Sequence, residues 1–333
     1  MIGLKLNSHN PSSAKPKRVT IICNPFAGKG LATNMAKEAE RFSIQKNWRI
    51  VANVQSEYAG HIENELACKY ADDTDLIILI GGDGTLRELI AGLRQNLHHT
   101  EIAFIPMGNA NVVARELNIP LKPGHALQML ETSTTTLVDI GILEMKTEED
   151  QNTINRQSMI FLAMLEIGFG AKIVHIVNQL RLGKLQRLYH LWGDLVYAIA
   201  GILAFMQKNP DVIDVEQNNQ KAKSKHIIVS NMQTYAKGWS LTPEANCQDG
   251  LLDIAINKKG SRISTLATFL LAAQRKRSPD SRMAYSQASE VVLKGSPKTF
   301  MQVDGDPIYF SGFAKVRIEP KAFNLHVPID QKL

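Results

Sequence analysis

An almost wholly apolar stretch that runs into a glycine-rich loop constrains the fold of this chain more than any other feature. Asp75–Ile80 reads DLIILI and is followed directly by GGDGT at 81–85, after which Leu86–Leu97 has a helical pattern. An apolar run without alternation is typical of a strand that is covered on both faces of a parallel sheet. Because parallel strands need a crossover between them, the segment predicts an α/β fold.

The same order of strand, loop and helix occurs four times before residue 137. We expect strands at Arg18–Cys23, Trp48–Val54, Asp75–Ile80 and Ile102–Pro106, each followed by a helix, at Leu31–Phe42, Ala59–Tyr70, Leu86–Leu97 and up to about Leu117. Such a series predicts a Rossmann-like parallel sheet with right-handed crossovers.

The pattern changes after residue 137. Short strands separated by Gly, Pro and Asn or Asp are expected there, at 137–145, 158–168, 225–231, 251–257, 289–294, 299–303 and 314–319, with one helix near 186–207. This spacing is typical of an antiparallel β-sandwich. The sequence therefore predicts a flexible segment at 1–17, an α/β domain at 18–137 and a β-rich domain at 138–330. Pattern alone leaves open whether the last strand returns to the first domain.

Composition narrows the classes of partner. The 333 residues carry a net charge of +6 and are 44% hydrophobic, which excludes a disordered chain. A basic excess favours phosphate-bearing partners such as nucleotides, nucleic acid or an anionic membrane surface. Three cysteines without a CxxC pair predict neither a zinc site nor a disulfide framework. The longest apolar stretch, Leu195–Met206, has about 12 residues, against the roughly 20 that span a bilayer.

Loops at the carboxyl ends of the four expected strands meet at one edge of the sheet, where open α/β folds bind ligands. Glycine lets the backbone approach a ligand closely, and free amides at a helix N-terminus attract phosphate. The residues that we expect to hold a phosphate-bearing ligand there, which the family resemblance described below implies to be a nucleotide, are Asn24, Pro25, Gly28 and Lys29 after the first strand, Ser56 after the second, Gly81, Gly82, Asp83, Gly84 and Thr85 after the third, and Asn109 after the fourth. Neither a Walker motif nor GxGxxG is present, so the prediction rests on the convergence of the loops.

Asp83 places a carboxylate beside the expected phosphates. Such an anion needs a metal ion or a substrate proton as its partner, so Asp83 is a candidate catalytic residue. The alternative is a tight turn in which its side chain bonds the nearby main chain.

Several segments together resemble one known family. In order and spacing, Asn24-Pro25-x-x-Gly28-Lys29, GGDGT at 81–85 and PMGNAN at 106–111 resemble the catalytic domain of the diacylglycerol kinase/sphingosine kinase family of lipid kinases, in its bacterial diacylglycerol kinase form. Three further segments also resemble elements of this family. They are Ser56-Glu57-x-x-x-His61, Asp249-Gly250-Leu251-Leu252-Asp253 and Val303-Asp304-Gly305-Asp306. The likeness extends over about residues 18–320 and implies an α/β domain of the NAD kinase/diacylglycerol kinase type, followed by a β-sandwich. GGDGT by itself also occurs in NAD kinases and phosphofructokinases.

The resemblance implies an ATP-dependent, Mg²⁺-requiring kinase that phosphorylates a lipid hydroxyl, with diacylglycerol or a related glycerolipid as the first candidate. In such kinases the acidic residue that opens the last element is the general base, which here is Asp304; an Asp-Gly turn without chemistry is the alternative. Asp306 replaces the usual Glu and is expected to contact the nucleotide or its metal. Asp249 resembles a carboxylate associated with a separate, peripheral Mg²⁺, to which Asn246 and Leu251 can offer oxygens.

The third loop departs from the family pattern. Gly-Thr-x-Asn-Asp is usual there, whereas Asn109 and Val112 stand in place of the Thr and the final Asp, which removes a carboxylate. This departure leaves open a catalytically impaired, nucleotide-responsive membrane-binding protein. Because GGDGT is shared with NAD kinases, an NAD kinase-like enzyme that acts on a soluble substrate is the second alternative.

The helix expected near 186–207 has an apolar stripe behind the basic residues Arg181, Lys184 and Arg187. This pattern fits a helix buried against the second domain, or one that lies on a membrane surface. We expect a cytoplasmic protein that meets its lipid substrate at a membrane surface, with peripheral contact to the inner membrane face left open. No nucleic acid partner is expected, because no RRM, KH or zinc signature is present, and a homodimer is left open.

Overall fold

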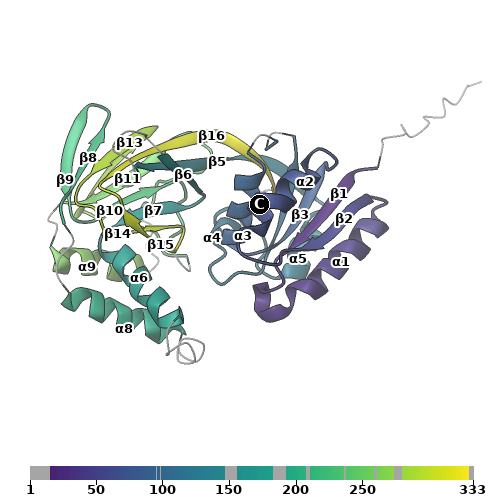
Figure 1. Cartoon of the computed structure of the whole chain (residues 1–333), viewed down its shortest axis with the longest axis horizontal. Coiled ribbons are helices and arrows are strands. Elements are labelled where there is room, and N and C mark those ends of the chain that lie inside the picture. Colours follow the sequence, from purple (N-terminus) through teal and green to yellow (C-terminus); the bar gives the residue numbers. More distant parts are fainter. Residues whose placement is uncertain are drawn as a thin grey trace, which may run out of the picture.

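Two β-sheets organise the chain (Figure 1). The computed structural model describes residues 16–94, 96–97, 99–146, 156–182, 193–207, 211–235, 238–258, 261–273 and 280–329. Within these residues one sheet has ten strands and the other has six.

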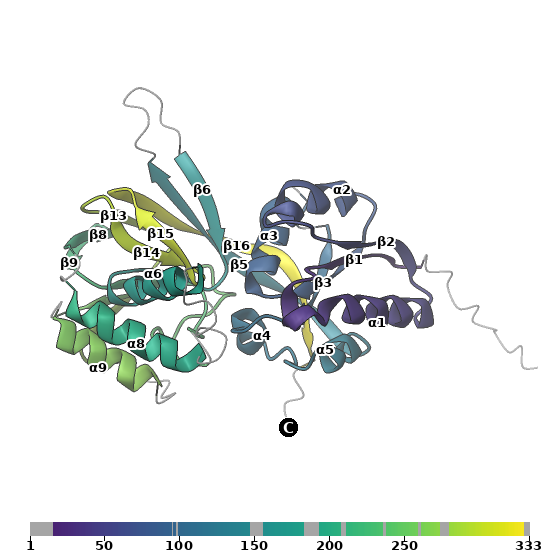
Figure 2. The same ribbon diagram turned by 60° about the horizontal axis from the view of Figure 1, so that its bottom comes forward.

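The parallel part of the ten-stranded sheet forms the first half of the chain. Its strands lie in the order β2 (Arg49–Gln55), β1 (Arg18–Cys23), β3 (Leu76–Gly81) and β4 (Glu101–Pro106). Its helices are α1 (Ala32–Gln45), α2 (Ala67–Ala71), α3 (Asp83–Gly92), α4 (Val112–Glu116) and α5 (Pro123–Met129), with short turns η1 (Ala27–Gly30) and η2 (Ile62–Leu66). Figure 2 shows α1 and α5 on one face of the sheet and α2 and α3 on the other. Every residue of β3 is buried, as expected of a strand covered on both faces.

Two long antiparallel strands join this half to the rest of the chain. β5 (Ser133–Lys146) pairs with β16 (Phe313–Pro328), and the register shifts at a bulge between Glu319 and Phe323. Beyond the bulge, residues 324 and 325 of β16 pair in parallel with the start of β4. The last strand therefore returns to the first half. Residue 137, where the sequence predicts a domain boundary, lies inside β5.

Asp139 on β5 stabilises this crossing from a fully buried position. Its carboxylate accepts hydrogen bonds from the N–H of Lys321, within the bulge of β16, at 2.6 Å and from the N–H of Gly250 at 2.8 Å. Its own N–H donates to Cys247 O at 2.8 Å. A bulge leaves main-chain groups without a ladder partner, and buried main-chain groups need one. Asp139 supplies that partner for Lys321.

The second half is an antiparallel sandwich. The ten-stranded sheet continues through β6 (Arg156–Phe161), β13 (Glu290–Lys294), β8 (Ile213–Gln217) and β9 (Gln220–Ser224). The six-stranded sheet has the order β12 (Met283–Ala288), β11 (Leu252–Asn257), β10 (Ile227–Ser230), β7 (Met164–Ile167), β14 (Thr299–Val303) and β15 (Asp306–Phe310). Buried side chains of both sheets form the core between them, among them Leu143, Phe161, Ile167 and Val291. The predicted fold class, a parallel α/β half followed by an antiparallel sandwich, is confirmed.

Three helices lie together beside the six-stranded sheet (Figure 1). They are α6 (Phe169–Leu182), α8 (Gly193–Met206) and α9 (Arg262–Ala273). α8 covers the second part of the helix expected near 186–207, and residues 183–192 lie outside the described residues. α6 is not among the elements expected from the sequence. Among the described residues, the helices are too short or too polar to cross a membrane.

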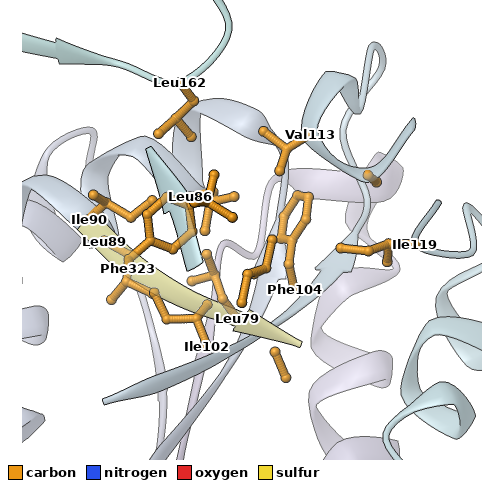
Figure 3. Packing of buried hydrophobic residues seen from close by; sticks show 14 of the residues in the cluster. Leu79, Leu86, Leu89, Ile90, Ile102, Phe104, Val113, Ile119, Leu162 and Phe323 are labelled. Carbon is orange, nitrogen blue, oxygen red and sulfur yellow. The ribbon is translucent and has the colours of Figure 1, made fainter. Parts of the chain in front are cut away.

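The apolar core of the first half extends to residues from the second (Figure 3). One cluster combines side chains of α3, the parallel strands, β16 and the connection after β6, among them Leu79, Leu86, Leu89, Ile90, Phe104, Leu162 and Phe323. All of these side chains are buried. Burial of an apolar side chain of this size contributes about 2 kcal/mol. Hydrophobic packing therefore joins the two halves in addition to the shared strands.

A chain of polar side chains ties the returning end of β16 to the first half. His326 Nε2 lies 2.9 Å from Glu101 Oε2, and Lys17 Nζ donates to the same oxygen at 2.6 Å. Ser133 Oγ lies 2.8 Å from His326 Nδ1. The hydrogen bond with His326 and the ion pair with Lys17 lower the pKa of Glu101 to about 2.

Replacing Glu101 tests this contact. We expect Glu101→Gln to lower the melting temperature at neutral pH by about 2 °C, because a partly exposed ion pair contributes at most about 1 kcal/mol. A carboxyl group with a lowered pKa stabilises the fold above its unfolded value of 4.5, and this stabilisation is lost as the pH falls toward 2. Thermal unfolding between about pH 7 and pH 3 should therefore show the gap between wild type and variant closing as the pH falls.

Glu131→Gln is the matched control, because Glu131 also pairs with a lysine, Lys46 at 2.8 Å, but from a more exposed position. This control should change the melting temperature little at any pH. A gap for Glu101→Gln that stays constant over the pH range would contradict the prediction.

Candidate active site

Three of the predicted loops are hydrogen-bonded to one another at the carboxyl edge of the parallel strands. Asn24 N–H donates to Ile80 O at 2.9 Å, and Gly28 N–H donates to Met107 O at 2.9 Å. Met107 N–H in turn donates to Gly81 O at 2.7 Å. The loops after β1, β3 and β4 thus form one surface, as expected of parallel strands whose ends meet at the same edge.

Asn24 connects two of these loops through its side chain. Its Nδ2 donates to Thr85 Oγ1 at 3.2 Å, and its Oδ1 accepts the N–H of Phe26 at 3.0 Å in a tight turn around Pro25. Ser56, after β2, lies beside this turn, because its N–H donates at 2.9 Å to the carbonyl of the residue that precedes Asn24. Residues from all four predicted loops therefore lie at this edge.

The glycines Gly82 and Gly108 allow two of the loops to touch. A Cβ atom on Gly108 would lie 2.8 Å from the Cα of Gly82, and one on Gly82 would lie 3.1 Å from the Cα of Gly108. Asn111 fixes this arrangement, since its side chain accepts from Gly108 N–H and donates to Gly108 O, both at 2.9 Å. Asn109 lies between these residues and is exposed.

The turn after β1 presents a cation at the same edge. Gly28, Lys29 and Gly30 have φ values of 59°, 56° and 87°, so three successive residues adopt the left-handed conformation. Glycine reaches this conformation without strain, whereas Lys29 does so at a cost. The side chain of Lys29 is exposed beside the loops.

A cavity of about 710 Å³ opens next to the Asn-Pro turn. Its lining includes Pro25, Phe26, Ser56, His61 and Tyr70. His61 is fixed in place, because its Nδ1 accepts the N–H of residue 57 at 3.0 Å and its ring stacks on that of residue 58. The cavity thus joins apolar and aromatic walls to two of the residues predicted to hold a nucleotide.

Asp83 lies in the first turn of α3, which begins three residues before the expected start. Gly82 is extended, with φ −104° and ψ −176°, and lies between the end of β3 and the start of α3, so the helix starts within GGDGT. The carboxylate of Asp83 accepts the N–H of Val113 at the start of α4 at 3.1 Å. Burial raises the pKa of Asp83, and this main-chain donor opposes the rise. Asp83 therefore connects α3 to α4, and its catalytic role stays a prediction.

Asp304 lies in the two-residue turn between β14 and β15, where Val303 pairs with Asp306. Its carboxylate accepts three main-chain N–H groups that follow β6 and begin β7, those of Leu162 at 2.8 Å, Ala163 at 2.9 Å and Met164 at 3.0 Å. The first donates to Oδ2 and the other two donate to Oδ1. Oδ2 therefore keeps a further lone pair for another donor.

Arg87 on α3 connects the carboxyl edge of the parallel strands to this turn. Its Nη2 forms an ion pair with Asp306, and its Nη1 donates to Val303 O at 3.4 Å. Burial disfavours the charge of the guanidinium, but the carboxylates of Asp304 and Asp306 outweigh it and raise the pKa of Arg87. In turn, burial raises the pKa of Asp304, while Arg87 and the three amides oppose the rise.

The residues predicted to hold a separate magnesium ion lie in the turn before β11. Asn246 Oδ1 accepts the N–H of Gln248 at 3.2 Å, and Asp249 Oδ1 accepts the N–H of Leu251 at 2.9 Å. Both Asn246 and Asp249 are exposed. Within the described residues, no group of three or more His, Cys, Asp and Glu side chains could hold a metal ion. The predicted site contains one carboxylate, so it stays a prediction.

Two residues that connect the halves are absent from the predicted set. The sequence could have indicated Arg87, because it lies four residues, or about one helical turn, after Asp83 of the glycine loop. Glu116 on α4 accepts the N–H groups of Gln233 at 3.0 Å and Thr234 at 2.9 Å. Its partners are main-chain groups far along the chain, so no local pattern indicates them.

Comparison with known proteins agrees with this architecture. Residues 18–143 match the family described as diacylglycerol kinase catalytic domain, and residues 163–327 match the family described as YegS C-terminal NAD kinase beta sandwich-like domain. A diacylglycerol kinase of Staphylococcus epidermidis is 25% identical over 292 residues, which are 87% of this chain and 86% of the relative. A probable YegS-like lipid kinase of Pseudomonas aeruginosa is 26% identical over 282 residues, 82% of each chain.

A solved structure shows the same fold. The crystal structure of a putative diacylglycerol kinase from Bacillus anthracis superposes with a TM-score of 0.72 at 19% sequence identity, and the match covers 96% of this chain and all of the other. Both halves of the chain, in the order that the structure shows, thus correspond to known domains. The chain belongs to the diacylglycerol kinase and YegS-type family of lipid kinases.

Proposed function

We propose that this lipid kinase transfers the γ-phosphoryl group of ATP to the hydroxyl group of diacylglycerol or a related glycerolipid. The observation that carries the proposal is the ion pair between Arg87 and Asp306, because it brings the turn with Asp304 against the helix that begins at GGDGT. The relative from Staphylococcus epidermidis is named a diacylglycerol kinase, which favours this lipid.

The nucleotide is proposed to bind along the carboxyl edge of the parallel strands. Its phosphates would lie against the main chain of Gly81–Thr85 and Gly28, with positive charge from Lys29. The base would occupy the adjoining cavity, which Pro25 and Ser56 line. A volume of about 710 Å³ is in the usual range of roughly 300–1,000 Å³ for small-molecule sites.

Magnesium is proposed to bind together with ATP. It would neutralise the charge of the transferring phosphate. Asp306 fits this ion, because it is an exposed carboxylate beside the nucleotide edge. We propose the oxygens of Asn246, Asp249 and Leu251 for a second, peripheral Mg²⁺, since the set consists of the oxygen ligands that hard cations prefer.

Asp304 is proposed as the general base. As the lipid oxygen attacks the γ-phosphorus, its hydroxyl proton would pass to the free lone pair of Asp304 Oδ2, and ADP would leave with the electron pair of the breaking bond. Arg87 and the three amides favour the ionised form that a base requires, while burial makes that carboxylate more basic. Because the net effect raises its pKa, the Asp304 carboxylate is a stronger base than an ordinary aspartate.

The lipid is proposed to enter from a membrane that contacts α8 and α9. These helices lie side by side in Figures 1 and 2. Both expose large apolar side chains, and Ile202 and Met206 of α8 are 62% and 74% exposed while Ile263 of α9 is 75% exposed. An apolar surface on neighbouring helices, on a chain with a net charge of +6, suits an anionic bilayer.

Replacement of the proposed base tests the reaction. We expect Asp304→Asn to lower kcat at least about 100-fold with a short-chain diacylglycerol and ATP, because an amide cannot accept the proton. The measurement is transfer of labelled phosphate to dioctanoylglycerol, sphingosine and NAD in parallel. Asp214→Asn, an exposed carboxylate on β8, is the control. Unchanged kcat in Asp304→Asn would contradict the assignment of the base. Phosphorylation of NAD by the wild-type protein would favour the soluble-substrate alternative. If the wild-type protein binds ATP but transfers no phosphate, the catalytically impaired alternative is favoured.

Removal of the positive charge of Arg87 tests whether this residue lowers the pKa of the proposed base, Asp304. Arg87→Met removes a positive charge that lowers the pKa of Asp304, so the pKa should rise and the acidic limb of the pH profile of kcat/KM should move to higher pH. Arg94→Met is the matched control, because Arg94 also pairs across the halves, with Glu319 at 3.9 Å. An acidic limb that stays in place, or moves equally in the control, would contradict this electrostatic role.

Vesicle binding tests the apolar surface. We expect Ile202→Ser combined with Met206→Ser to weaken binding to phosphatidylglycerol vesicles at least about fivefold, because each exposed side chain contributes about 1–2 kcal/mol when it enters the membrane interface. Ile44→Ser removes an isoleucine of α1 that is 60% exposed and is the matched control. If wild type and the double variant sediment equally with the vesicles, this face is not the surface that binds the membrane.

A further inference from the structure

We propose that Gln302 is a positioning residue for the reaction, which orients the turn that carries Asp304 and is itself held by the buried carboxylate of Glu166. This inference rests on the proposed function, since that function assigns Asp304 as the base. Gln302 is 2% exposed and Glu166 is fully buried, so neither meets solvent.

The turn itself has a demanding conformation. Asp304 and Gly305 have φ values of 49° and 87°, and a two-residue turn with both φ positive is of type I′. The N–H of Asp304 donates to Met164 O at 2.9 Å, which fixes the first side of the turn. The second side depends on Gly305, whose N–H donates to Gln302 Oε1 at 2.7 Å.

Gln302 cannot rotate freely, because its other end is bound as well. Its Nε2 donates to Glu166 Oε2 at 3.1 Å. The two residues are direct cross-strand neighbours, in the register of β14 with β7. Since the amide oxygen must face Gly305 and the amide nitrogen must face Glu166, the side chain has one orientation that satisfies both contacts.

Glu166 is itself surrounded by donors. His226 Nε2 lies 2.8 Å from its Oε1, and Tyr235 Oη donates to its Oε2 at 3.0 Å. Burial and the charge of Glu166 raise the pKa of Tyr235 well above its usual value, so the phenol keeps its proton. Gly170 at the start of α6 leaves the room for this carboxylate, because a Cβ there would lie 2.1 Å from Oε1. A buried carboxylate tolerates no loss of donors without a large cost, so the network favours one arrangement.

The consequence is a rigid support behind the turn. The contact of Gln302 with Gly305 fixes the peptide between the proposed base and Asp306, and Asp306 is the residue that pairs with Arg87. A small rotation of this peptide would displace both carboxylates from the nucleotide edge. Misplacement by about 1 Å can lower a rate about 100-fold without weakening binding.

Gln302→Met is the first test, since it keeps the volume and removes both hydrogen bonds. We expect kcat with ATP and dioctanoylglycerol to fall at least about tenfold, while KM for each substrate stays within about twofold. Hydrogen–deuterium exchange should become faster in a peptide that spans residues 302–308, because the amide of Gly305 loses its acceptor. Thr299→Val is the matched control on the same strand, since it removes a hydrogen bond to Ser296 O at 2.8 Å away from the turn. It should leave kcat unchanged.

The exchanged pair Gln302→Glu with Glu166→Gln is the second test. It keeps one amide and one carboxylate between β14 and β7, so we expect kcat within about threefold of wild type. Wild-type kcat in Gln302→Met, an equal loss in Thr299→Val, or an exchanged pair as slow as Gln302→Met would each overturn the proposal. If Gln302→Met does not fold, the kcat of the exchanged pair decides.

Asp304→Asn separates this inference from the proposed function. A loss of turnover in Asp304→Asn together with wild-type kcat in Gln302→Met would overturn the positioning role alone. Full turnover in Asp304→Asn would overturn the assignment of the base, whatever the result for Gln302.

Discussion

β16 pairs with β5 on both sides of its bulge, while its other neighbour changes from β13 to β4, and this change is supported by hydrogen bonds to one buried carboxylate. Lys321, in the bulge of β16, has a φ of 53°, a conformation that costs a non-glycine residue about 1 kcal/mol. Asp139 offsets this cost, because it accepts the N–H of Lys321 and also that of Gly250. The same carboxylate therefore sets the path of the last strand and the position of the turn with Asp249. The pairing of β16 with β4 in turn covers an edge of the parallel sheet that would otherwise be open.

The two halves are also held together around the candidate site. Arg87 reaches from α3 to the turn with Asp304 and Asp306, and Glu116 reaches from α4 to the main chain at residues 233 and 234. α3 and α4 begin at two of the glycine-containing loops, and Asp83 joins them. Phosphoryl transfer depends chiefly on positioning and on neutralisation of charge. The contacts between the halves thus act on the geometry that such a reaction needs.

Local pattern predicted the parts of the fold in which neighbours along the chain decide the structure. The apolar run of β3 and the glycine loops indicated the parallel sheet and its carboxyl edge, and Asn24 and Thr85 do meet there. α6 is absent from the elements expected from the sequence, and its contacts with β14, β15 and β7 of the six-stranded sheet show that distant strands support this helix. The return of β16, the ion pair of Arg87 and the support of Gln302 depend on partners far along the chain. Neither periodicity nor spacing encodes such partners.

The return of β16 also has a consequence for the order in which the molecule can assemble. His326 and Glu101 are 225 residues apart along the chain, yet they meet where β16 pairs with β4. During synthesis the four parallel strands emerge first, but the neighbour of β4 emerges only after the other described strands and helices. The first half therefore leaves the ribosome with an unpaired hydrogen-bonding edge, and it can close that edge only after the whole sandwich has been made. Completion of the parallel sheet therefore requires that translation has passed β16.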